Sequence, residues 1–156
     1  MRGSSHNSAL VISVDSHAYN NRKWPITSGH SVFEKKKEDL KDAISSIFQE
    51  CKEADWDQEG AAPIALQTWV MANALVEKLP TVKVSPSVFA TRNGKIGLQW
   101  LQPSGVAMSM LVEGAGSLVY AAILGDGRKK YGSEIFNGTL PGDVREQLLQ
   151  VAAKSP

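Results

Sequence analysis

Apolar residues repeat with a helical period in two stretches of the first half of the chain. Over residues 32–54, and again over residues 64–79, they fall three or four positions apart. Gly60 and Pro63 interrupt the pattern between the two stretches, and Pro80 follows the second. The pattern therefore predicts two helices joined by a tight loop, an αα-hairpin. The two apolar stripes consist of Leu40, Ile44, Ile47, Phe48 and Cys51, and of Leu66, Trp69, Ala72, Val76 and Leu79 with Leu75 beside them.

Helix ends are indicated by short polar residues and prolines. Ser31 and Glu34 match the capping box, in which each side chain satisfies a free backbone N–H group of the other residue. Pro63 is suited to the first turn of the second helix. Near the C-terminus, Thr139 is expected to cap a third helix with Pro141 in its first turn. The apolar side of that helix is expected to be Leu140, Val144, Leu148 and Val151.

The second half alternates between apolar and polar residues, which is typical of strands with one buried face. Glycine-rich turns divide it into five expected strands over residues 84–91, 95–101, 106–113, 117–124 and 128–136. Asn93-Gly94 is a strong hairpin signal between the first two. The strand over 117–124 is apolar on both faces and is expected near the centre of the sheet. The expected core-facing residues are Ile96, Leu98, Trp100, Met108, Met110 and Val112.

The element order predicts an α+β fold with two layers. An antiparallel meander of about five strands packs against an N-terminal αα-hairpin and a C-terminal helix. Residues 31–156 are expected to form this single domain. Residues 1–30 are expected to form a flexible or strand-forming arm, rich in serine, asparagine and glycine. Within the arm, the β-prone residues 9–14 are expected either to add an edge strand to the sheet or to pair with another copy of the chain.

Charge is unevenly distributed, although the net charge of the 156 residues is only +1. Residues 1–37 carry six basic and two acidic side chains, whereas residues 38–60 carry two basic and eight acidic ones. Residues 61–156 carry nine basic and six acidic side chains. The near-neutral total disfavours a broadly cationic nucleic-acid binder. The acidic block is expected to be either a solvated helix face or an acidic contact surface.

The single cysteine and the apolar run lengths exclude further classes. Cys51 alone cannot form an internal disulfide and is expected to be a buried part of the helix stripe. His6, His17 and His30 lack metal-ligand spacing, so neither a metal site nor a cofactor is expected. No apolar run approaches the roughly 20 residues that span a bilayer. Because the first residues also lack the apolar core of a signal peptide, a cytoplasmic protein without membrane contact is expected.

Three carboxylates in five residues are the best candidates for chemistry. Asp55, Asp57 and Glu59 could bind a divalent cation or act as an acid/base pair. Their spacing fails as a calcium loop, because Trp56 intervenes and no glutamate stands at the twelfth position. The alternative is structural: Trp56 packs between the helices, and the carboxylates cap the second helix and face water.

A basic turn is the candidate for phosphate contact. Arg128, Lys129 and Lys130 follow Gly125-Asp126-Gly127, but the spacing matches neither a P-loop nor a dinucleotide fingerprint. The segment also lies between two expected strands. A hairpin turn is therefore the favoured interpretation, and a backbone phosphate contact is the alternative.

The acidic loop also carries a family resemblance. Asp55-Trp56-Asp57-x-x-Gly60-Ala61-x-Pro63-Ile64, followed by Asn93-Gly94-Lys95-Ile96-x-Leu98-x-Trp100, resembles a family of small bacterial proteins of unknown function. The resemblance covers about residues 36–150, and Gln58-Glu59 stand where the family often has Gly-Tyr. It implies a soluble bacterial protein, often carried on mobile or accessory DNA. It implies no established activity. Separately, Trp56 and Gly60 are candidates for an interaction loop.

Three functions follow from these features. The first is a non-enzymatic protein-interaction factor, such as an inhibitor, antitoxin or immunity-type binder, with a homodimer formed through the arm or an edge strand. The second is a metal-dependent hydrolase using Asp55, Asp57 and Glu59. The third, which the net charge disfavours, is nucleic-acid binding through Arg128, Lys129 and Lys130. The absence of a complete catalytic constellation favours the first.

Overall fold

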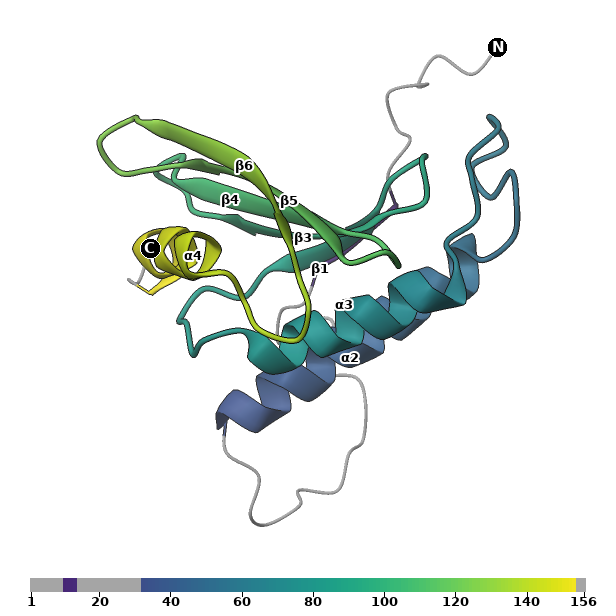
Figure 1. Cartoon of the computed structure of the whole chain (residues 1–156), viewed down its shortest axis with the longest axis horizontal. Coiled ribbons are helices and arrows are strands. Elements are labelled where there is room, and N and C mark those ends of the chain that lie inside the picture. Colours follow the sequence, from purple (N-terminus) through teal and green to yellow (C-terminus); the bar gives the residue numbers. More distant parts are fainter. Residues whose placement is uncertain (1–9, 14–31, 154–156) are drawn as a thin grey trace.

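A computed structural model describes residues 10–13 and 32–153 of the chain. Figure 1 shows a sheet with helices packed below it. The elements in chain order are β1 (Leu10–Ser13), α2 (Val32–Cys51), α3 (Leu66–Lys78), β2 (Ser87–Ala90), β3 (Ile96–Leu101), β4 (Ala107–Val112), β5 (Ser117–Ile123), β6 (Lys129–Ile135) and α4 (Gly142–Ala152).

The sheet is antiparallel, and its six strands follow one another in chain order from β1 to β6. The predicted five-stranded meander is confirmed as β2–β6, because short turns join strands that are adjacent in sequence. The β-prone arm segment supplies the sixth strand: Leu10 lies opposite Ala90, and Ser13 lies opposite Ser87. Of the two alternatives for residues 9–14, the structure has the edge strand on its own sheet.

Within the described residues, α2, α3 and α4 pack on one face of the sheet, so the predicted two-layer α+β fold is confirmed. One core joins side chains from α2, α3, α4 and strands β2–β5. The expected core-facing residues of β3 and β4 are all buried, with Trp100 fully enclosed. The expectation that the strand over 117–124 lies near the centre of the sheet is wrong: it is β5, which lies between β4 and the edge strand β6. It turns Leu118, Tyr120 and Ala122 to the core, and its second apolar face is not covered by a helix of the described chain.

The αα-hairpin is held by contacts between its two helices. Glu77 of α3 binds α2 twice: its carboxylate pairs with Lys41, and its backbone carbonyl accepts from Lys37 Nζ at 2.8 Å. Trp69 Nε1 donates to Ser45 Oγ at 3.1 Å, and the Trp69 ring lies 6.1 Å from that of Phe48. The predicted stripe of α2 is confirmed, since it is buried except at the partly exposed Phe48.

Three expectations about helix ends are wrong. The first helix ends at Cys51 rather than Ala54, because turns begin directly after it. The second begins at Leu66 with Ala65 as N-cap, so Pro63 lies in the loop and not in the helix. Pro141, rather than Thr139, is the N-cap of α4, and no side chain caps that end. The Ser31–Glu34 capping box lies outside the residues whose side chains are described.

Leu66 also departs from the predicted stripe of the second helix. Its side chain is 61% exposed, and Val70, one turn further on, is 49% exposed. Because α3 begins two residues later than expected, Leu66 stands at the helix terminus, where the hairpin loop carries it away from the core. Of the rest of the stripe, Trp69 is partly exposed, and Ala72, Leu75, Val76 and Leu79 are buried. The pair formed by Leu66 and Val70 is a small apolar patch on the outside of α3.

The C-terminal end of α4 is fastened to two other segments. The backbone N–H groups of Lys83 and Val84 donate to the carbonyl of Ala152 at 3.0 and 3.1 Å. The side chain of Gln102, in the β3–β4 turn, donates to the carbonyl of Val151. The last carbonyls of a helix lack partners within it, so these bonds satisfy groups that would otherwise be orphaned. They hold α4 against β4 and β5.

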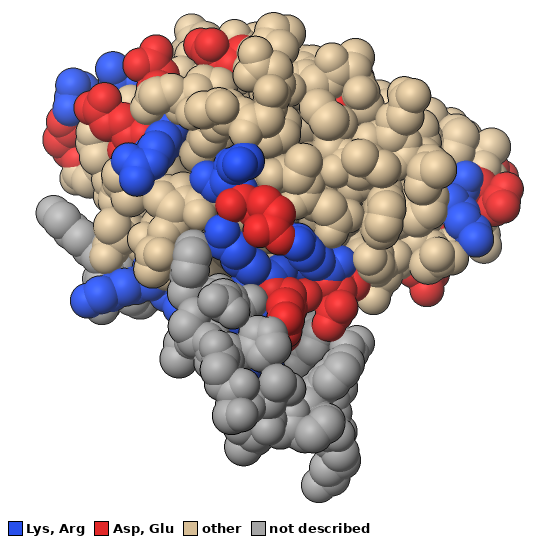
Figure 2. All heavy atoms as spheres, turned by 60° about the horizontal axis from the view of Figure 1, so that its bottom comes forward, with Lys and Arg blue, Asp and Glu red and all other residues tan. Residues whose placement is uncertain are grey.

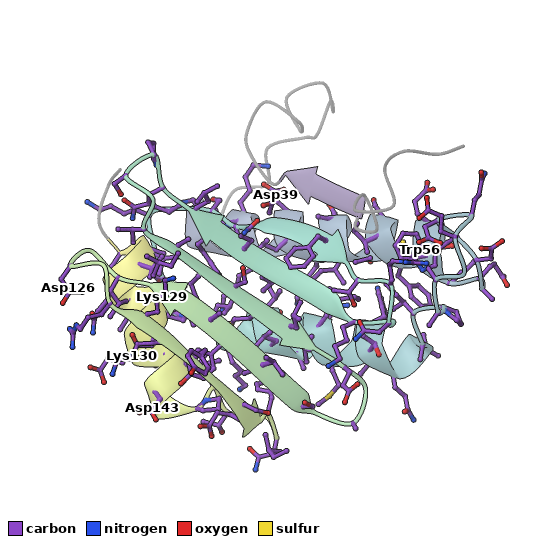
Figure 3. All side chains as sticks on the ribbon, turned by 90° about the horizontal axis from the view of Figure 1, so that it is seen from above. Asp39, Trp56, Asp126, Lys129, Lys130 and Asp143 are labelled. Atoms are coloured by element: carbon purple, nitrogen blue, oxygen red, sulfur yellow. The ribbon has the colours of Figure 1, made fainter. Side chains whose placement is uncertain are left out.

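The opposite face of the sheet has no helix of the described chain against it (Figure 3). We call it the open face. On this face, the ring of Phe89 in β2 packs over Gly97 in β3. A Cβ added at Gly97 would lie 2.2 Å from an atom of the ring. Within the described ranges, no helix is both long and apolar enough to cross a lipid bilayer.

Candidate functional site

The acidic loop between α2 and α3 has an unusual backbone path. Asp55 and Gln58 take the left-handed conformation, with φ of 63° and 62°, and Gly60 follows with φ of 88°. Side-chain-bearing residues adopt this region at a cost, so the surrounding contacts must hold them there. The N–H of Asp55 donates to the carbonyl of Ala61 at 2.8 Å, which closes the loop. The loop is therefore a compact, internally bonded turn rather than an open acidic segment.

Asp57 organises this loop from inside. Its Oδ1 accepts the backbone N–H groups of Glu59 at 2.8 Å and of Ala61 at 3.0 Å. Its Oδ2 lies 2.9 Å from Nε of Arg92 as an ion pair, and the Asp57 side chain is only 6% exposed. Both oxygens of this carboxylate are therefore engaged within the protein.

Arg92 joins the acidic loop to the β2–β3 hairpin. Besides its ion pair with Asp57, its guanidinium donates to the carbonyl of Glu59, and its own carbonyl accepts the N–H of Ala62 at 2.7 Å. Arg92 is not among the candidate residues that the sequence suggests. The only available signal was its place directly before Asn93-Gly94 in the hairpin, and nothing local indicates a partner 35 positions earlier in the chain.

The electrostatics favour an ionised Asp57. Burial raises the pKa of its carboxyl, but the N–H groups of Glu59 and Ala61 and the Arg92 guanidinium outweigh burial and lower the pKa below its ordinary value. A carboxylate held in this way supports a fold. It is poorly suited to act as a general base, because Oδ1 accepts two backbone N–H groups, Oδ2 is ion-paired with Arg92, and the proton affinity of the carboxylate is reduced.

The other residues of the loop also bind its backbone. Asp55 Oδ1 accepts the N–H of Gly60 at 2.7 Å, and Trp56 Nε1 donates to the carbonyl of Ala62 at 2.9 Å. Trp56 is half-buried against the core. The expectation that the carboxylates cap the second helix is wrong, since α3 has no side-chain cap. Among the described residues, no three acidic, histidine or cysteine side chains are placed to hold a metal ion.

Cys51 is fully buried at the end of α2, as its place in the apolar stripe predicts. Burial, with smaller contributions from Glu50 and Asp57, raises the pKa of its thiol to about 11. The carbonyl of Cys51 accepts the N–H of Ile64 at 2.8 Å, which ties the end of α2 to the start of α3. A thiol so far from ionisation at neutral pH is a packing residue.

The basic segment forms the predicted hairpin turn between β5 and β6. The N–H of Gly127 donates to the carbonyl of Leu124 at 2.9 Å. Arg128 turns back onto Asp126, with Nε 2.6 Å from Oδ2 and the backbone N–H 3.0 Å from Oδ1. These bonds lower the pKa of Asp126. Lys129 and Lys130 are successive strand residues, so they point to opposite faces of the sheet, and the three cations do not converge.

The two candidate segments lie far apart. Figure 3 shows Trp56 at one end of the molecule and Asp126, Lys129 and Lys130 at the other. On the side of the molecule drawn in Figure 2, acidic and basic side chains lie next to one another, and neither sign forms an extended field. The structure therefore brings the acidic loop together with Arg92 and not with the basic turn.

A third candidate is the open face. The strand registers place sixteen residues of β2–β6 on it, and Lys129 at one corner is the only charged residue among them. Four of the six exposed large hydrophobic residues of the described chain belong to it: Leu101, Ile123, Tyr131 and Ile135. The full set is Ser87, Phe89, Gly97, Gln99, Leu101, Ala107, Ser109, Leu111, Ser117, Val119, Ala121, Ile123, Lys129, Tyr131, Ser133 and Ile135.

The fold and these three segments define a two-layer α+β protein whose sheet has one helix-covered face and one open face that carries a single charged residue. Comparison with known proteins adds no relative: no family model, curated protein or solved structure matches the chain. The function must therefore be inferred from the surface that the structure itself presents.

Proposed function

We propose that this chain is a non-enzymatic protein-interaction factor that binds its partner with the open face of the sheet. The observation that carries the proposal is the exposure of Leu101, Ile123, Tyr131 and Ile135, between 41% and 81%, on one nearly uncharged surface. Contiguous exposed apolar surface on a folded domain marks sites of association. We propose an inhibitor, antitoxin or immunity-type factor that is encoded on a bacterial accessory or mobile element and acts in the cytoplasm.

The composition of the open face indicates the chemistry of the partner. The face carries aromatic and aliphatic side chains and a single charge, and depletion of charged residues is typical of the centre of a protein interface. A nucleic-acid partner would require cations to neutralise phosphates, and this face offers Lys129 alone. The partner is therefore expected to be a protein with an apolar patch of its own. Self-association through an edge strand of the sheet belongs to the same proposal.

The proposal predicts that charge placed on the open face abolishes binding. Leu101 and Ile123 lie in one row across the sheet, because both are register partners of Ala107. The double substitution Leu101→Lys/Ile123→Lys is expected to weaken partner binding by at least about tenfold, since two charges would be buried without counterions. The measurement is quantitative enrichment of proteins from cells of the source organism, with wild-type and variant chains compared side by side.

The matched control is Leu66→Lys/Val70→Lys, which charges two comparably exposed apolar residues on α3. The control is expected to enrich the same partner as the wild type. Equal enrichment by the wild type and by the Leu101→Lys/Ile123→Lys variant would contradict the proposal. So would loss of the partner from the α3 control alone, which would place the binding surface on the helices.

A further inference from the structure

The outer edge of β6 is an unused pairing edge. β6 ends the strand order, and within the described chain its only strand neighbour is β5. It is seven residues long, uninterrupted by proline, and mostly exposed. Such an edge presents a row of backbone donors and acceptors that can pair with another strand.

The ladder between β5 and β6 determines which residues point outward. In an antiparallel pair, hydrogen-bonded residue pairs alternate with non-hydrogen-bonded ones. The pairs just beyond the two ends of the ladder are both hydrogen-bonded: Leu124 N–H donates to Arg128 at 2.9 Å, and Phe136 N–H donates to Gly116 at 2.8 Å. Even-numbered residues of β6 therefore bond to β5. The backbone groups that face the free edge belong to Lys129, Tyr131, Ser133 and Ile135.

We propose that β6 pairs antiparallel with β6 of a second copy of this chain, about a two-fold axis at Gly132. In this register Tyr131 and Ser133 of the two copies form hydrogen-bonded pairs, in agreement with their outward backbone groups. Lys130 of each copy lies opposite Glu134 of the other, and Lys129 lies opposite Ile135. The two six-stranded sheets then join into one of twelve strands.

Charge complementarity selects this register from its neighbours. The outward backbone groups also allow a two-fold axis at Tyr131 or at Ser133. With the axis at Tyr131, Lys130 lies opposite Gly132. With the axis at Ser133, Glu134 lies opposite Gly132. Only the axis at Gly132 pairs all seven residues of β6 and sets Lys130 opposite Glu134. The two-fold symmetry forms this Lys130–Glu134 pair twice. Both contacts fall at non-hydrogen-bonded positions, where opposite side chains approach most closely. Neither side chain has an ion-pair partner within the part of the chain that the structure describes.

The inference rests on the self-association that forms part of the proposed function and deepens it by naming the strand and its register. A chain that stays monomeric could still bind a partner on its open face. A joined sheet would place Tyr131 and Ile135 of both copies at the seam, so that the two open faces become continuous. The edge lysines have a competing interpretation as a guard against edge pairing. Under that interpretation the chain is monomeric, and the oligomeric state distinguishes the two.

The test is sedimentation velocity of the full chain over a wide range of concentrations, with charge-reversed variants. Lys130→Glu and Glu134→Lys alone each set like charges opposite one another, and each is expected to weaken the dimer by roughly tenfold or more. The double variant Lys130→Glu/Glu134→Lys restores two opposite-charge pairs and is expected to dimerise within a few-fold of the wild type. Both residues lie on the edge strand and are at least partly exposed, so the fold should tolerate the changes.

A second pair of variants tests the backbone. Ser133→Pro removes an outward N–H group without touching the β5 ladder, and it is expected to abolish the dimer, whereas Ser133→Ala keeps the N–H group and the dimer. A wild type that is monomeric at every concentration overturns the inference, as does a double charge variant no tighter than the single ones. Leu101→Lys/Ile123→Lys is expected to remain a dimer, so loss of partner binding and loss of dimerisation are separate results.

Discussion

Asp57→Asn is expected to lower the melting temperature of the protein by roughly 5–10 °C. The amide retains an oxygen that can accept the N–H groups of Glu59 and Ala61, but it removes the charge facing Arg92 and places an NH₂ group or a neutral oxygen there. Arg92, whose side chain is 40% exposed, would lose the ion pair that it makes with the largely buried carboxylate. Thermal unfolding followed by circular dichroism measures the shift.

The matched control is Asp55→Asn, the same chemical change two residues earlier. Asp55 is exposed, its Oδ1 accepts only the N–H of Gly60, and asparagine tolerates the left-handed conformation that this position requires. Its melting temperature is expected to stay within about 2 °C of the wild type. Arg92→Ala combined with Asp57→Asn is expected to cost less than the sum of the two single changes. Equal shifts for Asp55→Asn and Asp57→Asn would show that the ion pair contributes nothing.

The same residue predicts how stability depends on pH. Since the pKa of Asp57 is lower in the folded protein than in the unfolded chain, the unfolded chain takes up a proton at higher pH than the folded protein does. The stabilisation is therefore fully present above the ordinary aspartate value of about 4 and is lost as the pH falls through the folded-state pKa. The decline in melting temperature below pH 5 is expected to be shallower in Asp57→Asn than in the wild type.

Asp126 contributes to the same acid decline, because its pKa is also lowered. Asp126→Asn therefore serves as the comparison, and the wild type, the two single variants and the double variant are titrated together by thermal unfolding. Each substitution is expected to remove the part of the acid-induced fall in melting temperature that its own carboxylate causes. Parallel curves for the wild type and Asp57→Asn would refute the assignment to Asp57.

Gly116→Ala is expected to destabilise the fold by about 3 kcal/mol. Gly116 has φ of 88°, a conformation that costs a side-chain-bearing residue energy. An added Cβ would also lie 2.9 Å from the carbonyl oxygen of Phe136, a backbone atom that cannot turn aside. That contact stands where the N–H of Phe136 donates to Gly116, so the clash would force apart the segment leading from β6 to α4. Urea unfolding gives the change in free energy.

Gly127 offers the control for this prediction. It has a similar φ of 84°, but a Cβ there meets nothing within 4 Å. Gly127→Ala carries the conformational cost alone and is expected to lose about 1 kcal/mol. The difference between the two variants isolates the contact with Phe136. Equal losses in both variants would mean that the backbone near Phe136 yields to the added methyl group.

Much of the fold could be predicted because secondary structure depends on local repeats. The alternation Ile96, Leu98, Trp100 identifies both a strand and its buried face, and the confirmed stripe from Leu40 to Cys51 does the same for α2. The ends of the helices were harder to predict from the sequence. Leu66 continues the periodic pattern and yet is exposed, because the path of the loop before it, rather than its spacing, determines where α3 begins.

The candidate site shows a different limit. The cluster of Asp55, Asp57 and Glu59 could be found in the sequence, but its role could not. Whether Asp57 faces water, a metal or Arg92 depends on a hairpin that follows some thirty residues later and folds back onto the loop. Two aspartates with the same side chain differ in pKa and in available hydrogen-bond partners when one of them is enclosed by backbone N–H groups and a guanidinium.

By itself, the sequence determined the order of helices and strands, the alternating faces of β3 and β4, the burial of Cys51 and the turn chemistry of Asn93-Gly94 and Asp126-Gly127. Only the tertiary structure decided that Arg92 pairs with Asp57 and that the apolar residues Leu101, Ile123, Tyr131 and Ile135 gather on one exposed surface. The physical reason is that the periodicity of helices and strands depends on residues close together in the sequence. Which face of the sheet is covered depends on where helices from distant parts of the chain pack. The three helices of the described chain occupy one face of the sheet, and none of them covers the other face.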